Sequence, residues 1–189
     1  IGSNGLSYKV AVIDDGVEDH EDLFNNVVSK VLSGYTANGI GDGSPKANHK
    51  HGQACAGIIS ATQNNNMGIT GIAPSTLIVP IRIFKQYGSF SDSKIAKAIK
   101  KSWYNYDASV LSNSWGYNDT ISRSQITNAI QEASIYGRNG KGCVVVFASG
   151  NECTNYVLYP ATVNGVISVG AVDKCGIRSG RADSIPYSC

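Results

Sequence analysis

Asp14, His51 and Asn151 are the side chains of this sequence whose types and positions point most directly to acid–base and hydrogen-bond chemistry. Asp14 closes an apolar run and is followed by Asp15 and a glycine, so its carboxylate stands where the backbone turns sharply. His51 precedes a segment rich in alanine and glycine, and Asn151 follows another apolar run through a glycine. Taken singly, they have ordinary interpretations: an Asp-Gly turn, a solvated or capping histidine and a turn asparagine. Their combination along one chain favours the functional interpretation.

The segments that must position these residues alternate between apolar runs and helical periodicity. We expect buried strands at Lys9–Asp14, Leu77–Ile83, Ser109–Ser112, Cys143–Ala148 and Val166–Ala171. We expect helices at Gln53–Ala61, Asp92–Trp103 and Ser122–Tyr136, and the longest irregular stretch at Ser33–Lys50. Uniformly apolar strands between amphipathic helices predict an α/β fold, a doubly wound three-layer sandwich with a central, mostly parallel sheet. Ligands of such sheets bind beyond the carboxyl ends of the strands.

The motifs around these residues resemble those of the subtilisin-like serine proteases, in the order that family has. The matching segments are Val10-Ala-Val-Ile-Asp-Asp-Gly-Val, His51-Gly-Gln-Ala-Cys-Ala-Gly, Ser112-Asn-Ser-Trp-Gly and Phe147-Ala-Ser-Gly-Asn. The resemblance implies a serine endopeptidase in which Asp14 orients His51 and His51 takes a proton from a serine. It also implies that Asn151 donates to the oxygen of the tetrahedral intermediate. Asp15 is the competitor for Asp14, but Asp14 is the residue that matches the motif.

The same resemblance implies a polypeptide substrate that binds as an added strand. One edge of its groove would be Ser114, Trp115 and Gly116, and the opposite edge would include Gly88. The alternative for Trp115 is an ordinary core aromatic. Asp119 lies close to where the kexin and furin branch places an acid that recognises basic residues, which suggests basic specificity as a hypothesis.

A structural calcium site is a further implication of the resemblance. Asp22 matches the metal-binding aspartate of the family, and the segment from Gln63 to Ile69 resembles the loop that supplies oxygens. The ligands would be Asp22, the side chain of Asn65 and the carbonyl oxygens of Gln63, Met67 and Ile69. The alternative is an asparagine-rich turn. No His/Cys cluster suggests zinc.

The nucleophilic serine of the family has no counterpart in this sequence. No Gly-Thr-Ser-x-Ala motif and no Gly-x-Ser-x-Gly elbow occurs in the 189 residues. We therefore expect residues 1–189 to be the N-terminal and central part of a C-terminally incomplete peptidase domain, with a propeptide or missing C-terminal segment as partner. The alternative is a truncated or pseudoenzyme domain that binds or inhibits through the same peptide groove. A dinucleotide-binding protein is disfavoured because no Gly-x-Gly-x-x-Gly follows the first strand.

Composition narrows the class of protein. Apolar residues make up 42% and charged residues 16% of the chain, with a net charge of +2, so neither a nucleic-acid partner nor a disordered chain is favoured. No stretch is apolar enough to predict a membrane span. The five cysteines, with few Lys and Glu, predict a secreted, extracellular protein with one or two disulfides besides buried thiols.

Overall fold

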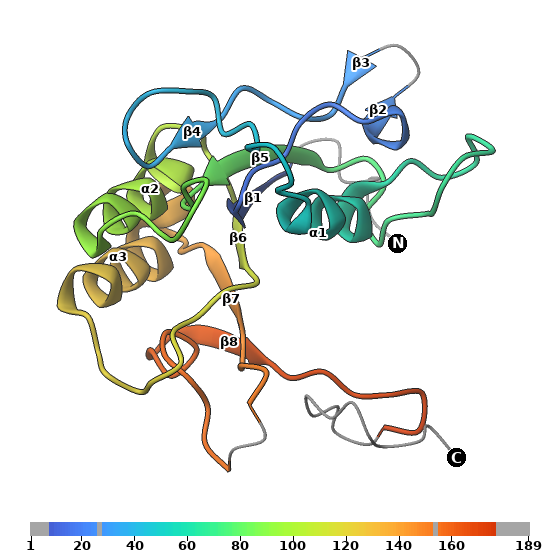
Figure 1. The fold of residues 1–189 in the computed structure, drawn as a ribbon. Helices are drawn as coiled ribbons and strands as arrows, with labels where there is room; N and C mark the ends of the chain where they lie inside the picture. The colour runs from blue at the N-terminus through green and yellow to red at the C-terminus, as the bar shows by residue number, and fades with distance from the viewer. Residues whose placement is uncertain (1–7, 26–27, 153–154, 177–189) are drawn as a thin grey trace.

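The computed structural model describes residues 8–25, 28–152 and 155–176 and has a parallel sheet at its centre (Figure 1). The sheet is six-stranded, in the order β4-β5-β1-β6-β7-β8, and every neighbouring pair is parallel. Its strands are β1 (Lys9–Asp14), β4 (Tyr35–Thr36), β5 (Leu77–Arg82), β6 (Val110–Asn113), β7 (Val144–Ala148) and β8 (Val166–Val169). The short strands β2 (Phe24–Asn25) and β3 (Val28–Ser29) form a separate antiparallel pair.

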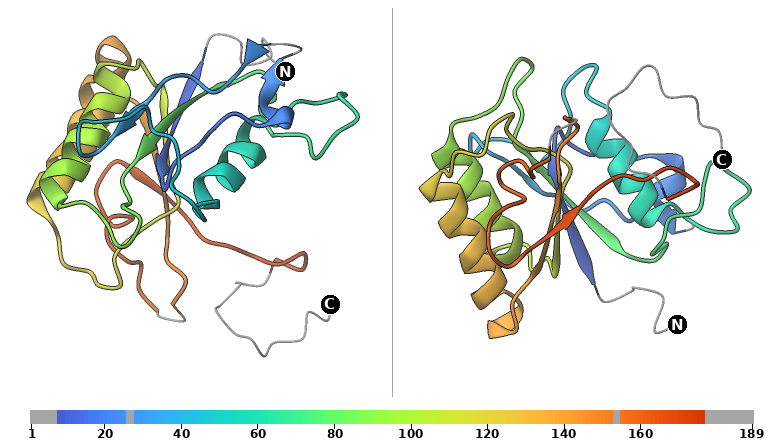
Figure 2. Two further views of the ribbon diagram at one scale, coloured as in Figure 1. Left: turned by 45° about the horizontal axis from the view of Figure 1, so that its top comes forward. Right: turned by 90° about the horizontal axis from the view of Figure 1, so that it is seen from below.

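Helices cover both faces of the sheet. Helix α1 (His51–Ser60) lies on one face, and α2 (Asp92–Tyr104) and α3 (Ser124–Gly140) lie side by side on the other, as the views in Figures 1 and 2 agree. A short 3-10 helix, η1 (Glu21–Leu23), follows the loop after β1. The predicted α/β sandwich with a central parallel sheet is therefore confirmed.

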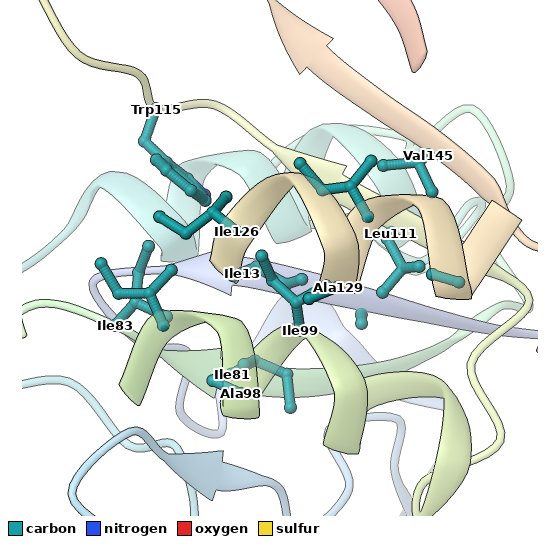
Figure 3. Close-up of a cluster of buried hydrophobic side chains, with 14 of the residues drawn as sticks. Ile13, Ile81, Ile83, Ala98, Ile99, Leu111, Trp115, Ile126, Ala129 and Val145 are labelled. Atoms are coloured by element: carbon teal, nitrogen blue, oxygen red, sulfur yellow. The ribbon is translucent and has the colours of Figure 1, made fainter. Parts of the chain in front are cut away.

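The core explains why the central strands are apolar throughout, whereas β8, which we expected to be buried, is mostly exposed. Along β1, Ala11 and Ile13 belong to the large cluster under α2 and α3, whereas Val10 and Val12 belong to a smaller cluster under α1. Both faces of the strand are thus removed from water, which no alternating pattern could satisfy. Figure 3 shows the large cluster, where aliphatic side chains of α2 and α3 meet those of the central strands.

The element boundaries differ from the sequence expectation mainly at the ends. The strand β4 lies inside the stretch that we expected to be irregular. It could not be predicted because only two residues, Tyr35 and Thr36, pair with β5, and two residues carry no periodic signal. Helix α3 loses its regular geometry after Tyr136, since Gly137 has a ψ of 162° and Arg138 a φ of 53°. The expected end at Tyr136 thus coincides with the end of the regular helix.

The chain path creates a crevice at the carboxyl end of β1. From β1 the chain passes to β4 and then through α1 to β5, both on one side of β1, and it returns through α2 to β6 on the other side. The direction of winding reverses here, and such reversal points are where open α/β sheets bind ligands. Asp14 is the last residue of β1 and therefore stands at this point.

Candidate active site

Asp14 and His51 are in direct contact. The Nδ1 atom of His51 lies 2.9 Å from each carboxylate oxygen of Asp14. Asp14 is 2% exposed, and burial raises its pKa against the lowering effect of the hydrogen bonds from His51 and from the Asp15 amide. The side chain of His51 is 59% exposed, and its second nitrogen, Nε2, has no hydrogen-bond partner among the described residues. The imidazole is thus fixed at one nitrogen and open at the other, as a general base requires.

Asp15 has a role that the sequence reasoning missed when it treated this residue only as a rival of Asp14. Its carboxylate oxygens accept hydrogen bonds from the backbone amides of Gly52, at 2.7 Å, and of His51, at 3.2 Å. A carboxylate at this position satisfies amides that the helix itself leaves unpaired and interacts favourably with the helix dipole. Asp15 therefore fixes the start of α1, and with it the backbone of His51. The signal was the pair of consecutive aspartates before a glycine.

Glycines permit the close approach of α1 to the end of β1. A Cβ atom at Gly52 would lie 2.5 Å from the carbonyl oxygen of Gly16. Gly16 has a φ of +121°, and a Cβ atom there would lie 2.5 Å from the backbone of Pro45. Larger residues at either position would push the helix, and the imidazole that it carries, away from Asp14.

A cavity of about 450 Å³ brings this pair together with part of the predicted substrate edge. Asp14, His51, Gly88, Ser114 and Trp115 all line it. Gly88 has a φ of +74°, and its carbonyl oxygen accepts from the amide of Lys85 at 2.9 Å, so a tight turn forms this wall.

The indole of Trp115 belongs to the core. The residue is 9% exposed, its Nε1 donates to Asn113 at 3.1 Å, and its ring packs edge-on against Phe147 at 5.1 Å. The ring is also drawn within the hydrophobic cluster of Figure 3. Trp115 therefore packs in the core and also borders the cavity, and its role in substrate binding stays a prediction.

A second cavity, of about 240 Å³, adjoins the first and shares Ser114 and Trp115 with it. Gly116 and Asn151 line this second cavity, and Asn151 is exposed in the loop after β7. Glu152 also lines it, which the sequence reasoning did not single out. The signal available was its place directly after Asn151 in a loop that follows a buried strand.

Asp119 is not placed to recognise a basic substrate side chain. Its carboxylate accepts two hydrogen bonds from the guanidinium of Arg123, both at 3.0 Å, and one from the amide of Ile121 at 2.9 Å. The bonds from Arg123 hold its pKa below the ordinary value. Asp119 is not among the residues that line either cavity. Its charge is therefore already paired within the protein.

Cys55 lies beside the Asp14–His51 pair, and one ligand atom from each of the three lies within 4.8 Å of the others. Its thiol contacts the hydroxyl of Ser114 at 3.5 Å, and burial raises its pKa, so the thiol stays protonated at neutral pH. Cys55 and Cys143 are free. The predicted disulfides would thus have to come from the other cysteines, of which Cys153 and Cys189 lie outside the described residues.

The residues predicted to bind calcium lie together, away from the Asp14–His51 pair. Asp22, in η1, is 5% exposed and accepts from Asn65 Nδ2 at 2.7 Å and from the amide of Ile69 at 2.9 Å. The bond from Ile69, followed by the one from Asn65, lowers the pKa of Asp22. The loop needs glycine at position 68, where φ is +47° and a Cβ atom would lie 2.2 Å from Asp22 Oδ2.

The donor chemistry of this loop fits a hard cation. The carbonyl oxygens of Gln63, Met67 and Ile69 accept no hydrogen bond from the described residues, so they are available as ligands. The Asn65 amide donates through Nδ2 to Asp22 and accepts at Oδ1 from the amide of Met67 at 3.2 Å, so a cation bound to its oxygen would replace these hydrogen bonds. A carboxylate, an amide oxygen and carbonyl oxygens are the ligand types that Ca²⁺ prefers.

Comparison with known proteins places these features in a family. The model of the subtilase family matches residues 5–186. A thermophilic serine proteinase of Bacillus sp. strain AK1 is 39% identical over 176 residues, covering 92% of this chain and 40% of that protein. A calcium-dependent protease of Trichormus variabilis is 34% identical over 200 residues, covering 96% of this chain and 29% of that protein. Among solved structures, sphericase aligns with a TM-score of 0.74 and 27% identity over 91% of this chain and 56% of its own. The chain thus spans less than two thirds of each of these relatives.

Proposed function

Because the chain belongs to the subtilase family, we propose that it provides most of the active site of a serine endopeptidase. Asp14 and His51 are its acid–histidine pair, and Asn151 is its oxyanion donor. The observation that carries the proposal is the contact of His51 Nδ1 with both carboxylate oxygens of Asp14, at 2.9 Å each. This contact leaves Nε2 as the proton acceptor on an exposed edge of the ring.

The roles follow from this geometry. Asp14 accepts from Nδ1–H, selects the tautomer whose Nε2 is unprotonated and stabilises the imidazolium that forms when Nε2 takes the proton of a serine hydroxyl. His51 then gives this proton to the leaving amine of the cleaved peptide bond. Asn151 donates from its side-chain amide to the oxygen that becomes negative in the tetrahedral intermediate. Its place in the cavity that adjoins the one around His51 supports this role.

The nucleophilic serine in this proposal comes from outside the 189 residues. The edge strand β8 carries apolar side chains that the described residues leave uncovered: Ile167 is 53% exposed and Val169 is 51% exposed. Exposed apolar side chains on an edge strand favour a further protein segment at this edge. We infer that a segment carrying the serine packs there, and a propeptide is a further expected partner.

The substrate is an extended polypeptide in this proposal. Ser114, Trp115 and Gly116 follow β6 and form one edge, and the turn at Gly88 forms the other. A peptide between them would add a strand through backbone hydrogen bonds and place alternate side chains in the two cavities. Because Asp119 is paired with Arg123, we propose no preference for basic side chains through that residue.

Calcium binding is the cofactor proposal. The ion would be held by Asp22, Asn65 and the carbonyl oxygens of Gln63, Met67 and Ile69. The Trichormus relative is named a calcium-dependent protease, which supports this proposal. The ion would supply structural cross-linking of this loop to η1 and no chemistry at His51.

We propose that the protein acts outside the cell, as its composition predicts. In the part of the chain that the structure describes, no helix combines the length and the apolar character that crossing a membrane demands.

The test is hydrolysis of an unstructured protein substrate by the protein that contains this chain. Mass spectrometry of the products should show cleavage within the polypeptide, and His51→Ala should abolish it. A substrate that binds without being cleaved by the wild-type protein would instead favour the alternative, a domain that binds or inhibits through the same groove.

A further inference from the structure

Arg82 and Thr36 lie next to each other at the edge of the sheet and carry buried polar atoms without partners. The two residues are in register between β5 and β4. Arg82 is 6% exposed and Thr36 is 1% exposed. Neither the Nε atom of Arg82 nor the Oγ1 atom of Thr36 has a hydrogen-bond partner among the residues that the structure describes. Leaving such groups unpaired is costly, most of all for a charged group.

Both residues line a cavity of about 470 Å³, between the loop that follows β4 and the segment that follows β5. Lys46 and Lys85 also line it, and both are exposed. The acidic residue of the lining is Asp42, whose carboxylate accepts from the amide of Ser44 at 3.1 Å and from its hydroxyl at 2.6 Å. Asp42 forms no ion pair with Arg82 in the described part of the chain, although burial lowers the pKa of Arg82 and the nearby charge of Asp42 opposes that shift. Positive charge therefore predominates in this cavity.

We propose that this cavity binds an oxyanion, a carboxylate or a phosphate group, through Arg82 and Thr36. A guanidinium presents its donors in one plane and binds such groups with two parallel hydrogen bonds. The threonine hydroxyl adds a neutral donor, and the two lysines attract the anion from the rim. An oxyanion in this cavity supplies a negatively charged acceptor beside two polar atoms that have no hydrogen-bond partner among the described residues.

Two sources of the oxyanion fit the position of the cavity. Lys85 and Gln86 line both this cavity and the one around His51, so the two spaces adjoin. The first source is an acidic side chain of a peptide in the groove, which would reach across this boundary. This source rests on the proposed function. A free phosphate or carboxylate ion could also enter from solvent. The chemistry recognised by Arg82 and Thr36 is the same for both.

The site is tested by calorimetric titration of the protein that contains this chain with inorganic phosphate. Arg82→Met should weaken binding at least about tenfold, because a charge-assisted hydrogen bond is lost. Thr36→Val keeps the volume and removes the hydroxyl, and it should weaken binding by about three- to tenfold. Lys97→Gln, which changes an exposed lysine of α2 outside the cavity, should leave binding unchanged. A wild-type protein that binds no phosphate, or variants that bind it equally well, would overturn the proposal.

Loss of folding does not confound the test with Thr36→Val. Since the hydroxyl of Thr36 has no partner without the anion, Thr36→Val should unfold at the same or a higher temperature than the wild type in anion-free buffer. Phosphate should then raise the unfolding temperature of the wild type more than that of the variant. An equal rise in both proteins would contradict the assignment of Thr36.

A substitution at Asp42 and a competition experiment with peptides test the oxyanion site further. Asp42→Asn removes the opposing charge and should tighten phosphate binding, and weaker binding would contradict the charge argument. Peptides with and without an acidic side chain, titrated in competition with phosphate, separate the two sources. Competition by the acidic peptide alone assigns the site to the substrate, and lack of competition assigns it to a free ion. Phosphate binding through Arg82 remains measurable even if the protein cleaves no peptide.

Discussion

Asp14 and Asp22 are both buried aspartates near the start of the chain, yet their surroundings shift their pKa values in opposite directions. Asp14 is 2% exposed, and burial raises its pKa, with the hydrogen bond from His51 only partly compensating. Asp22 is 5% exposed, and the amides of Ile69 and Asn65 lower its pKa. Burial alone therefore does not decide the protonation of a carboxylate, because the donors around it do.

The difference separates the carboxylate that we propose to act in catalysis from one that holds a loop in place. The partner of Asp14 is an imidazole, which can change its protonation state while remaining hydrogen-bonded. The partners of Asp22 are amides, which keep their protons and hold the loop from Gln63 to Ile69 against η1. Substitutions at the two positions should thus affect different properties.

Asp14→Asn should have the largest effect of all, and it should act on catalysis. Loss of the carboxylate that orients His51 should lower kcat about 10⁴-fold, because the wrong tautomer is favoured. Stability at neutral pH should stay the same or rise. The folded-state pKa of Asp14 lies above its ordinary value of 3.8. Ionisation of this group therefore lowers the free energy of unfolding as the pH rises from 3.8 through the folded-state pKa. Steady-state kinetics and thermal unfolding measure the two effects, with Asp107→Asn, an exposed aspartate, as control. A variant that loses stability but keeps its kcat would contradict the assignment.

A smaller catalytic effect is expected for Asn151→Ala. Removing one oxyanion donor should lower kcat about 10²–10³-fold and leave KM nearly unchanged, since the bond forms mainly in the transition state. Asn155→Ala changes an exposed asparagine of the same loop and is the matched control. Equal kinetic effects of both substitutions would remove Asn151 from the oxyanion role.

Asp22→Asn should act on stability instead. Loss of the ionised acceptor should lower the free energy of unfolding at neutral pH by about 1–3 kcal/mol. Because the folded-state pKa of Asp22 lies below its ordinary value of 3.8, this contribution is present above 3.8 and disappears as the pH falls through the folded-state pKa. Urea unfolding of both proteins over this pH range measures the difference. A difference that stays constant down to the lowest pH would show that ionisation of Asp22 is irrelevant.

Removal of calcium should affect the same region. A chelator should lower the unfolding temperature of the wild-type protein by several degrees, which corresponds to about 1–3 kcal/mol for a chain of this size. Asp22→Asn should respond little to the chelator, whereas Asp14→Asn should respond as the wild type does. Calorimetric scans with and without chelator provide the comparison, and identical responses of all three proteins would place the calcium site elsewhere.

The smallest effect is expected for Asp15→Ala. Loss of the hydrogen bonds to the start of α1 should cost about 1 kcal/mol of stability and reduce kcat only modestly. Thermal unfolding and steady-state kinetics measure both. A loss of kcat as large as that of Asp14→Asn would identify Asp15 as the partner of His51.

Much of the fold was predictable from the sequence because its central strands are buried on both faces. The run Lys9–Asp14 has the boundaries of β1, and the small residues after His51 correspond to the close packing of α1. The pairing of Tyr35 and Thr36 with β5 was not predictable, since two residues carry no periodicity.

The candidate site likewise has some features that the sequence predicts and others that it does not. Asp14 and His51 could be paired from motifs, because each stands at the end of a recognisable element. The bond of Asp15 to α1, the ion pair of Asp119 with Arg123 and the unpaired atoms of Arg82 and Thr36 depend on contacts that a sequence does not encode locally. These features required the three-dimensional arrangement.

The central claim is that Asp14 and His51 activate a serine, and the rate of covalent labelling by a fluorophosphonate tests it most directly. We expect the protein that contains this chain to be labelled on one serine, and His51→Ala and Asp14→Asn to slow labelling by at least about 10³-fold. Asp22→Asn should be labelled at the wild-type rate under conditions where it is folded. Absence of labelling in the wild-type protein, or labelling at the same rate in His51→Ala, would contradict the account.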